Sequence, residues 1–115
     1  ILHAHEGYDE VSLTGKVRLA RNNGVSDLSA ADFGMDFLKQ SDIYGGETVE
    51  DAAHIFMNVL NNKATAAQKN VVIANAATAI SVAKDIEIIK AVELARTSLE
   101  SGKALKSFKK LMELK

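Results

Sequence analysis

The spacing of apolar residues changes near the middle of the chain, and the first 46 residues have the spacing of extended structure. Apolar and polar side chains alternate with a period of two at 11–14 and 17–20, and residues 1–5 form a short apolar run, so each segment is predicted to be a short strand. The stretch 21–24 reads Arg-Asn-Asn-Gly. Because Asn and Gly tolerate the positive φ angles of primed turns, it predicts a hairpin that returns through a strand at 25–28.

Beyond residue 46 the apolar residues recur with the helical period of 3.6. A short helical turn is predicted to begin at Ser29 and to stop at Gly34, because a capping box opens it and a glycine follows it. Four longer helices follow, and their predicted N-caps are Thr48, Thr65, Asp85 and Ser101.

The predicted helix from Thr65 to Ala83 is apolar on nearly every face, so it should be the most buried of the four. Its predicted core residues include Val71, Val72, Ala76 and Ile80. Asn75 lies inside this helix, and a buried amide needs hydrogen-bond partners. We therefore expect Asn75 to be buried and bonded to loop backbone.

The other three helices each carry one apolar stripe that is predicted to face inward. These stripes comprise Val49, Ala52, Ala53, Phe56, Val59 and Leu60 in the first helix, Ile88, Ile89, Val92, Leu94, Ala95 and Leu99 in the third, and Leu105, Phe108, Leu111 and Met112 in the last.

Composition narrows the class of protein. The chain has 115 residues, a size typical of one domain, with 47% hydrophobic and 25% charged residues. No apolar run approaches the roughly 20 residues that span a bilayer, and a net charge of −1 provides no general attraction for nucleic acid. Cysteine is absent, which excludes disulfides and thiolate metal sites. The chain lacks an initiator Met and opens in an apolar extended stretch, so we expect it to be the C-terminal part of something longer.

Asp9 and Glu10 are the sharpest chemical feature of the sequence. They are adjacent carboxylates at the point where the first predicted strand meets a turn that contains glycine. A turn lets both side chains reach one site, whereas a regular strand would point them to opposite faces. Because Mg²⁺ is usually held by one or two carboxylates together with substrate phosphates, the pair predicts a magnesium site. The alternative is a solvated acidic turn without a ligand.

His3 and His5 offer a second metal hypothesis. They share one face of the first strand if that strand is regular, and a His-x-His pair followed by acids also fits a metal-dependent hydrolase of the amidohydrolase type. The one other histidine, His54, lies on a predicted helix, so no third nitrogen ligand is at hand. Exposed or half-buried histidines without a ligand are the alternative.

Three further patterns are weaker. The stretch 32–34 reads Asp-Phe-Gly like a kinase metal motif, but the kinase Gly-rich loop and catalytic loop are missing, which excludes that function. The Gly-Gly pair at 45–46 precedes a helix, and it is either an anion cradle or a plain loop-to-helix junction. One face of the last helix is either a phosphate-binding or a solvated surface, and it comprises Lys103, Lys106 and Lys110.

Together these motifs resemble a known family. The segment 7–12 reads Gly-Tyr-Asp-Glu-Val-Ser and is similar to the Gly-Leu-Asp-Glu-Ile-Ser metal motif of anthranilate phosphoribosyltransferases. Further family motifs follow in the family's order, namely Asp32-Phe33-Gly34-Met35, Gly45-Gly46, Ala74-Asn75-Ala76-Ala77 and Ser101-Gly102-Lys103-Ala104-Leu105. The chain departs from the family at Asp51, where Asn is usual, and at Ala30 or Ala31, where Pro is common. Neither departure touches the acidic pair.

The resemblance implies a fold class and a place in the family's chain. It implies an α/β fold, in which residues 1–115 are the C-terminal segment of the large α/β domain of a nucleoside-phosphorylase-like phosphoribosyltransferase. Short strands and a hairpin would occupy 1–46, and four main helices 47–115. The family's pyrophosphate-cradling Gly-rich loop, its anthranilate-holding residues and its dimerising N-terminal helices have no counterpart in the 115 residues.

The resemblance also implies a function. The full-length enzyme would transfer a phosphoribosyl group from phosphoribosyl pyrophosphate to anthranilate in tryptophan biosynthesis, in the cytoplasm, as a homodimer. Mg²⁺ would be its cofactor, held by Asp9 and Glu10, with Glu10 placed to bridge two ions. No catalytic residue is assigned in the chain, and the chain alone should be inactive. Two alternatives stay open, which are a hydrolase that uses His3, His5, Asp9 and Glu10, and a non-catalytic helical interaction module.

Overall fold

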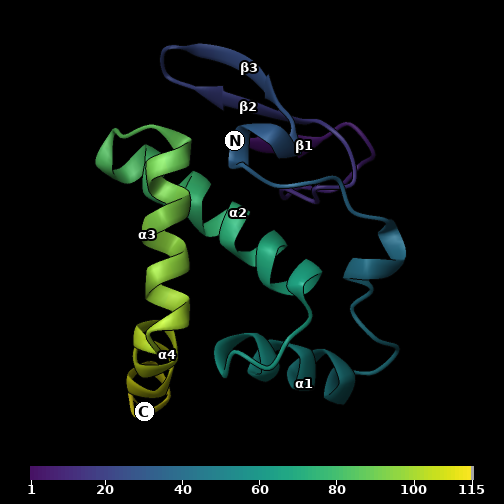
Figure 1. Ribbon diagram of the computed structural model, residues 1–115, viewed down its shortest axis with the longest axis vertical. Helices are drawn as coiled ribbons and strands as arrows, with labels where there is room; N and C mark the ends of the chain where they lie inside the picture. Colours follow the sequence, from purple (N-terminus) through teal and green to yellow (C-terminus); the bar gives the residue numbers. More distant parts are fainter. Residues whose placement is uncertain (115) are drawn as a thin grey trace.

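The computed structural model describes residues 1–114, and these form a small sheet followed by a run of helices (Figure 1). The sheet is antiparallel with the order β1-β2-β3, and its strands span Leu2–Ala4, Val17–Arg21 and Gly24–Leu28. Two short 3₁₀ turns follow, η1 at Ala30–Phe33 and η2 at Gln40–Ile43. The α-helices are α1 at Val49–Leu60, α2 at Ala66–Lys84, α3 at Ile88–Glu100 and α4 at Lys103–Met112. The fold is therefore of the α/β class, with strands first and helices after them.

The predicted hairpin is confirmed, although its turn has another geometry than expected. Residues 22 and 23 connect β2 to β3, and Arg21 pairs with Gly24 across the turn. We expected positive φ angles at the turn asparagines, but Asn22 and Asn23 both have negative φ. Gly24 alone takes a positive φ there, at 139°.

The strand predicted at 11–14 is wrong. This segment is an irregular loop in which residues 11–13 are buried and Leu13 has a φ of 61°. Such a left-handed backbone costs a non-glycine residue roughly 1–2 kcal/mol, so surrounding contacts must impose it. The alternation of apolar side chains was real, but it reflects a loop folded into the core rather than a paired strand.

Four α-helices were predicted and four are present within residues 1–114, but two of their N-caps were misplaced. Thr48 and Thr65 cap α1 and α2 as predicted, and their hydroxyls accept from the N3 amides at 3.0 and 3.2 Å. Asp85 does not begin α3 but ends α2 in a left-handed conformation, and α3 is preceded by Glu87. The N-cap of α4 is Gly102 rather than Ser101.

The core lies between the sheet, the loop after β1 and the paired helices α2 and α3. As expected, α2 has the largest number of buried positions of any helix, but they are not the four predicted ones. Val72 and Ala76 are exposed, and Val71 and Ile80 are half-buried. The buried side of α2 instead comprises Ile73, Ala74, Ala77, Thr78 and Ser81. Small side chains let α2 approach α3 closely, where Ala91 and Ala95 are also buried.

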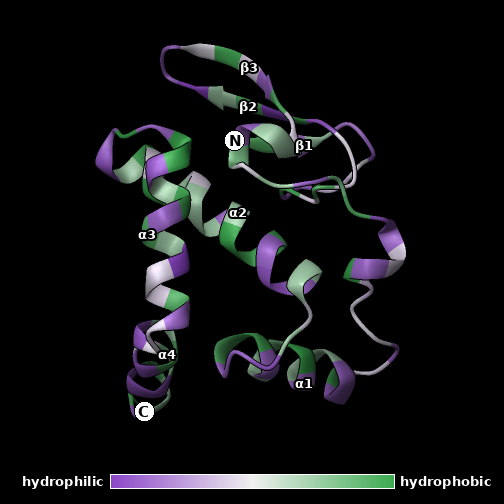
Figure 2. Ribbon diagram, in the orientation of Figure 1, coloured by the Kyte–Doolittle hydropathy of each residue, from purple (hydrophilic) through white to green (hydrophobic). Residues whose placement is uncertain are grey.

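Several apolar stripes predicted to face inward are exposed in the described residues. Hydropathy colouring shows apolar and polar residues alternating around α1, α3 and α4 (Figure 2). The exposed members include Val49, Ala52, Ala53, Phe56, Ile89, Leu94, Leu111 and Met112. The rings of Phe56 and Phe108 meet edge to face, with centroids 5.0 Å apart, and so join α1 to α4. The amphipathic pattern of these helices was therefore predicted correctly, but much of their apolar side is exposed within residues 1–114.

Candidate metal site

The acidic pair lies on a loop that leaves the sheet after β1 and returns to it at β2. The amide of Ala4 donates to the carbonyl of Tyr8 at 2.7 Å, and the amide of Gly7 donates to the carbonyl of Ala4 at 2.9 Å. Gly7 has a φ of 103°, which a residue with a side chain rarely adopts, so the turn requires glycine. The amide of His5 donates to the carbonyl of Lys16 at 3.0 Å and closes the loop at its base.

Beyond the acidic pair, the loop turns back into the core. Val11 and Leu13 are 2% and 1% exposed, and the carbonyl of Leu13 accepts from the amide of Leu38 at 2.9 Å. The hydroxyl of Thr14 donates to the carboxylate of Glu6 and lies 2.9 Å from the hydroxyl of Ser12. Asp9 and Glu10 are therefore exposed side chains on a loop whose two flanks are fixed.

The two carboxylates are available for a cation. The Asp9 side chain is 89% exposed, and its one polar partner within residues 1–114 is His3, whose Nδ1 lies 3.5 Å from Oδ1 of Asp9. Within residues 1–114, the Glu10 side chain has neither an ion pair nor a hydrogen bond. Hard oxygen donors with free lone pairs suit Mg²⁺, which completes its shell with water and substrate phosphate. The donor set therefore suits a magnesium ion whose remaining ligands come from outside these two side chains.

The four residues of the hydrolase hypothesis are not gathered into one cluster. Nε2 of His5 lies 3.1 Å from Oδ2 of Asp27 on β3, and Nε of Arg18 donates to Oδ1 of the same carboxylate at 3.1 Å. These bonds, chiefly that from Arg18, hold the pKa of Asp27 below its usual value. In the part of the chain that the structure describes, no three potential ligands lie close enough together to hold a metal.

The glycine pair ahead of α1 is a loop-to-helix junction whose anion position is already filled. The carboxylate of Asp51 accepts from the backbone amides of Glu47 and Thr48, both at 3.2 Å. Hydrogen bonds from Thr48 and from these amides lower the pKa of Asp51, so the helix's own carboxylate occupies its N-terminus.

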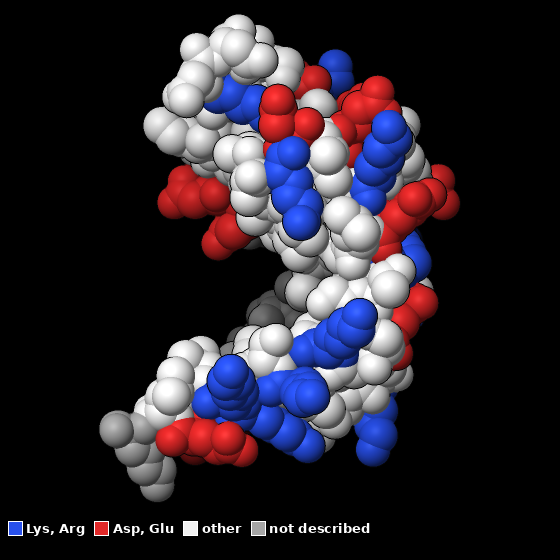
Figure 3. Space-filling model, turned by 90° about the vertical axis from the view of Figure 1, so that its left-hand side faces the viewer, with Lys and Arg blue, Asp and Glu red and all other residues white. Residues whose placement is uncertain are grey.

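The lysines of α4 form a solvated surface. Figure 3 shows Lys and Arg side chains gathered over the lower part of the molecule, where α4 lies, beside a hollowed side. Lys103, Lys106 and Lys110 are all exposed, and none of them forms an ion pair within residues 1–114. The geometry adds nothing in favour of a phosphate site at these lysines.

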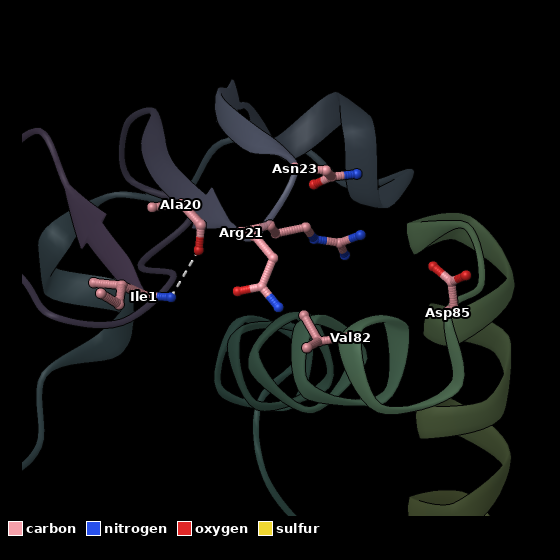
Figure 4. Close-up of a pocket in the computed structure, with 7 residues that line it drawn as sticks. Ile1, Ala20, Arg21, Asn23, Val82 and Asp85 are labelled. Atoms are coloured by element: carbon pink, nitrogen blue, oxygen red, sulfur yellow. Dashed lines mark hydrogen bonds between the residues drawn. The ribbon is translucent and has the colours of Figure 1, made fainter.

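Sequence reasoning missed a polar junction at the end of α2. Nη2 of Arg21 on β2 donates to Oγ of Ser81 at 2.6 Å, and Oγ of Ser81 donates to the carbonyl of Ile86 at 2.6 Å. Arg21 lines a pocket of about 560 Å³. Figure 4 shows this pocket between the hairpin and α2, with Val82 and Asp85 on the helical side. Arg21 and Ser81 lie 60 residues apart, and no pattern in the sequence indicates that they are in contact. The pocket contains none of the predicted ligands.

The prediction that Asn75 bonds to loop backbone is confirmed, but the prediction that it is buried is wrong. Its amide bonds to loop backbone at Val11, but the residue is half-buried rather than buried. This links the middle of α2 directly to the residue that follows the acidic pair.

Comparison with known proteins identifies relatives over nearly the whole chain. The chain is 51% identical over 114 residues to the anthranilate phosphoribosyltransferase of Cytophaga hutchinsonii and 46% identical over 114 residues to that of Flavobacterium psychrophilum. These alignments cover 98% and 99% of the chain but 35% and 34% of the relatives, in their C-terminal part. The chain thus spans about a third of the length of the curated relatives it matches.

Solved structures show the same fold. The anthranilate phosphoribosyltransferase of Saccharomyces cerevisiae in complex with 4-fluoroanthranilate superposes with a TM-score of 0.82 at 23% identity, covering 95% of this chain and 33% of the yeast chain. The Thermus thermophilus enzyme gives a TM-score of 0.78 at 25% identity, covering 90% of this chain and 31% of its own. No helix within residues 1–114 is both long and apolar enough to cross a membrane. Residues 1–105 match the model of the glycosyl transferase family, a/b domain, and the chain therefore belongs to that family.

Proposed function

We propose that residues 1–115 are the C-terminal, metal-binding segment of the catalytic domain of an anthranilate phosphoribosyltransferase. The observation that carries the proposal is that curated enzymes of this name match 98–99% of the chain at 46–51% identity. The exposed acidic pair on its anchored loop supports it, since a phosphoribosyl transferase must hold a cation near a departing pyrophosphate. The family's activity belongs to a chain about three times as long, so the 115 residues alone should be inactive.

The proposed substrates are phosphoribosyl pyrophosphate and anthranilate, in tryptophan biosynthesis. The Saccharomyces cerevisiae anthranilate phosphoribosyltransferase is solved in complex with PRPP and Mg, and in a separate structure in complex with 4-fluoroanthranilate. In the transfer, the bond from ribose C1 to the pyrophosphate oxygen breaks, a bond from C1 to the anthranilate nitrogen forms, and that nitrogen loses a proton. A bound Mg²⁺ would neutralise the charge of the departing pyrophosphate.

The part of this chain in that reaction would be positioning rather than proton transfer. Asp9 and Glu10 would hold the cation through oxygen donors, and their loop would keep it at a fixed place relative to the sheet. The aromatic amine is already nucleophilic, so orientation and charge stabilisation carry most of the catalysis. The cytoplasmic location and the homodimer that the resemblance implies stay predictions.

A chimeric enzyme tests the proposal. The 115 residues replace the matching third of the Cytophaga hutchinsonii enzyme, and loss of anthranilate fluorescence reports phosphoribosyl transfer. We expect the chimera to be active with Mg²⁺, and the double change Asp9→Asn with Glu10→Gln to lower kcat/KM by at least about a hundredfold. The matched control is Asp36→Asn with Glu47→Gln, two exposed carboxylates without a side-chain partner in residues 1–114, which should change little.

Three results would contradict the proposal. An inactive but folded chimera would show that the chain cannot supply this part of the enzyme. Full activity of the Asp9 and Glu10 double variant would refute the metal assignment. An equal loss of kcat/KM in the control variant would show that removing any two negative charges has this effect.

A further inference from the structure

The loop that carries the acidic pair is held from the helix beneath it by one side chain. Asn75, near the middle of α2, lies 64 residues from Val11 in sequence and makes two hydrogen bonds to it. Oδ1 of Asn75 accepts from the amide of Val11 at 2.9 Å, and Nδ2 of Asn75 donates to the carbonyl of Val11 at 2.7 Å. Figure 1 shows α2 running below the sheet in this view.

These two bonds fix the backbone on both sides of Val11. The amide of Val11 belongs to the peptide group that joins it to Glu10, so the bond to Oδ1 sets the orientation of that peptide plane. The carbonyl of Val11 belongs to the next peptide group, and the bond to Nδ2 sets the second plane. Because the peptide group between Glu10 and Val11 cannot rotate freely, the direction in which Glu10 leaves the loop is restricted as well.

The amide of Asn75 is itself held in one orientation. Its second Nδ2 proton is donated to the carbonyl of Val71, one turn earlier on α2, at 2.8 Å. Both amide protons and the carbonyl oxygen are therefore used. A flipped amide would set a donor against the amide of Val11 and an acceptor against its carbonyl, so only one orientation satisfies all three bonds. The anchor is consequently rigid and specific to asparagine.

We propose that Asn75 is a positioning residue for the metal pair, which sets the direction of Glu10, and through it the cation site, by clamping the peptide groups around Val11. The inference rests on the proposed function of Asp9 and Glu10. Asn75 does not touch the cation itself, because its three hydrogen bonds all go to backbone groups. Groups that orient metal ligands from outside typically matter by 10–100-fold in metal affinity.

Asn75→Ala in the chimeric enzyme is the primary test, and Asn75→Asp is a second variant. The aspartate keeps an acceptor for the Val11 amide but sets its second carboxylate oxygen against the carbonyls of Val11 and Val71, so it should weaken the anchor at least as much as alanine does. Asn70→Ala is the matched control, since Asn70 lies on the same helix, is also half-buried and has no side-chain hydrogen bond within residues 1–114. Thermal melts verify that each variant is folded.

Three measurements separate positioning from a purely structural role. The first is Mg²⁺ binding in the presence of inorganic pyrophosphate by titration calorimetry, which needs no turnover. We expect the Kd to rise about tenfold in Asn75→Ala and to stay unchanged in Asn70→Ala. The second is amide hydrogen exchange, which should accelerate at Val11 but not at Leu38, whose amide bonds to the same loop at Leu13. The KM for anthranilate should not change.

The outcomes are distinguishable. An unchanged Mg²⁺ affinity despite a freed Val11 amide would overturn the positioning role and leave the proposed function standing. A loss of metal affinity, anthranilate affinity and melting temperature together would also overturn it, because Asn75 would then be structural only. If the double variant Asp9→Asn with Glu10→Gln binds Mg²⁺ with the same Kd as the unaltered chimera, the proposed function itself is overturned, and the inference with it.

Discussion

Replacing Ser81 tests how much the hydrogen bonds between the sheet and the helices contribute to the free energy of unfolding. Ser81 is 1% exposed, and its hydroxyl accepts from Nη2 of Arg21 and donates to the carbonyl of Ile86, both at 2.6 Å. One oxygen thus joins β2, the end of α2 and the turn that leads to α3. Ser81→Ala removes both bonds with almost no change in volume, so it isolates the polar contribution.

The size of the effect follows from the two bonds. A neutral hydrogen bond contributes about 0.5–1.5 kcal/mol and one to a charged group about 1.5–3 kcal/mol. Arg21 is only half-buried, so water recovers part of the second term after the change. We therefore expect Ser81→Ala to lower the free energy of unfolding by about 2–3 kcal/mol.

Urea denaturation of the 115-residue chain, followed by far-UV circular dichroism, measures this change. With a slope of about 1–3 kcal/mol per molar urea, the midpoint should fall by roughly 0.7–3 M. The matched control is Ser107→Ala on α4, an exposed serine without a side-chain hydrogen bond in residues 1–114, and it should stay within about 0.5 kcal/mol. A Ser81→Ala effect no larger than this control would refute the reasoning.

A double-mutant cycle with Arg21→Met separates the two bonds. In that background only the bond from Ser81 to the carbonyl of Ile86 remains to be lost, so Ser81→Ala should cost only about 1 kcal/mol. If the cost is the same with and without Arg21, the bond between these two side chains contributes nothing to stability.

Two further predictions concern a carboxylate and a glycine. The pKa of Asp27 is held low chiefly by its bond from Arg18, so its stabilising effect is present above the unfolded-state pKa of about 3.9 and lost as pH falls through the lower folded value. NMR titration should show this pKa rising in Arg18→Met, and an unmoved pKa would contradict the assignment. Gly46→Ala should destabilise the chain by about 1–2 kcal/mol in urea, because φ is 86° there and the new Cβ would collide with Asp51. Gly45→Ala, where a Cβ meets nothing within 4 Å, is its control, and an equal effect at both positions would refute the reasoning.

The sequence predicted local structure better than it predicted burial. Hairpin and helices were recoverable because turn residues, N-caps and the 3.6 period act over a few residues, as at Thr48 and Thr65. Burial was harder for α2, whose apolar residues surround the helix and indicate no preferred face. The face that packs is the one with small side chains, such as Ala74 and Ala77, which permit the closest approach to α3.

The residue types of the candidate site could be predicted from the sequence, but the contacts that hold its loop in place could not. Two adjacent carboxylates in a turn are visible in any sequence, and Asn75 was expected to bond a loop because an amide in an apolar helix needs partners. That its partner is Val11, next to the acidic pair, depends on how α2 crosses the loop, which no short-range pattern encodes. The positive φ of Leu13 is likewise imposed by tertiary contacts rather than by the residue itself.

Fluorescence-monitored transfer on two polypeptides tests the central proposal most directly. Anthranilate, phosphoribosyl pyrophosphate and Mg²⁺ are supplied to the 115-residue chain alone and to the same chain joined to the first two thirds of the Cytophaga hutchinsonii enzyme. We predict no turnover by the chain alone, because two exposed carboxylates without a phosphate-cradling loop bind Mg²⁺ weakly. The joined protein should form phosphoribosylanthranilate at a rate that requires both Asp9 and Glu10. Turnover by the chain alone, or none by a folded joined protein, would contradict the account.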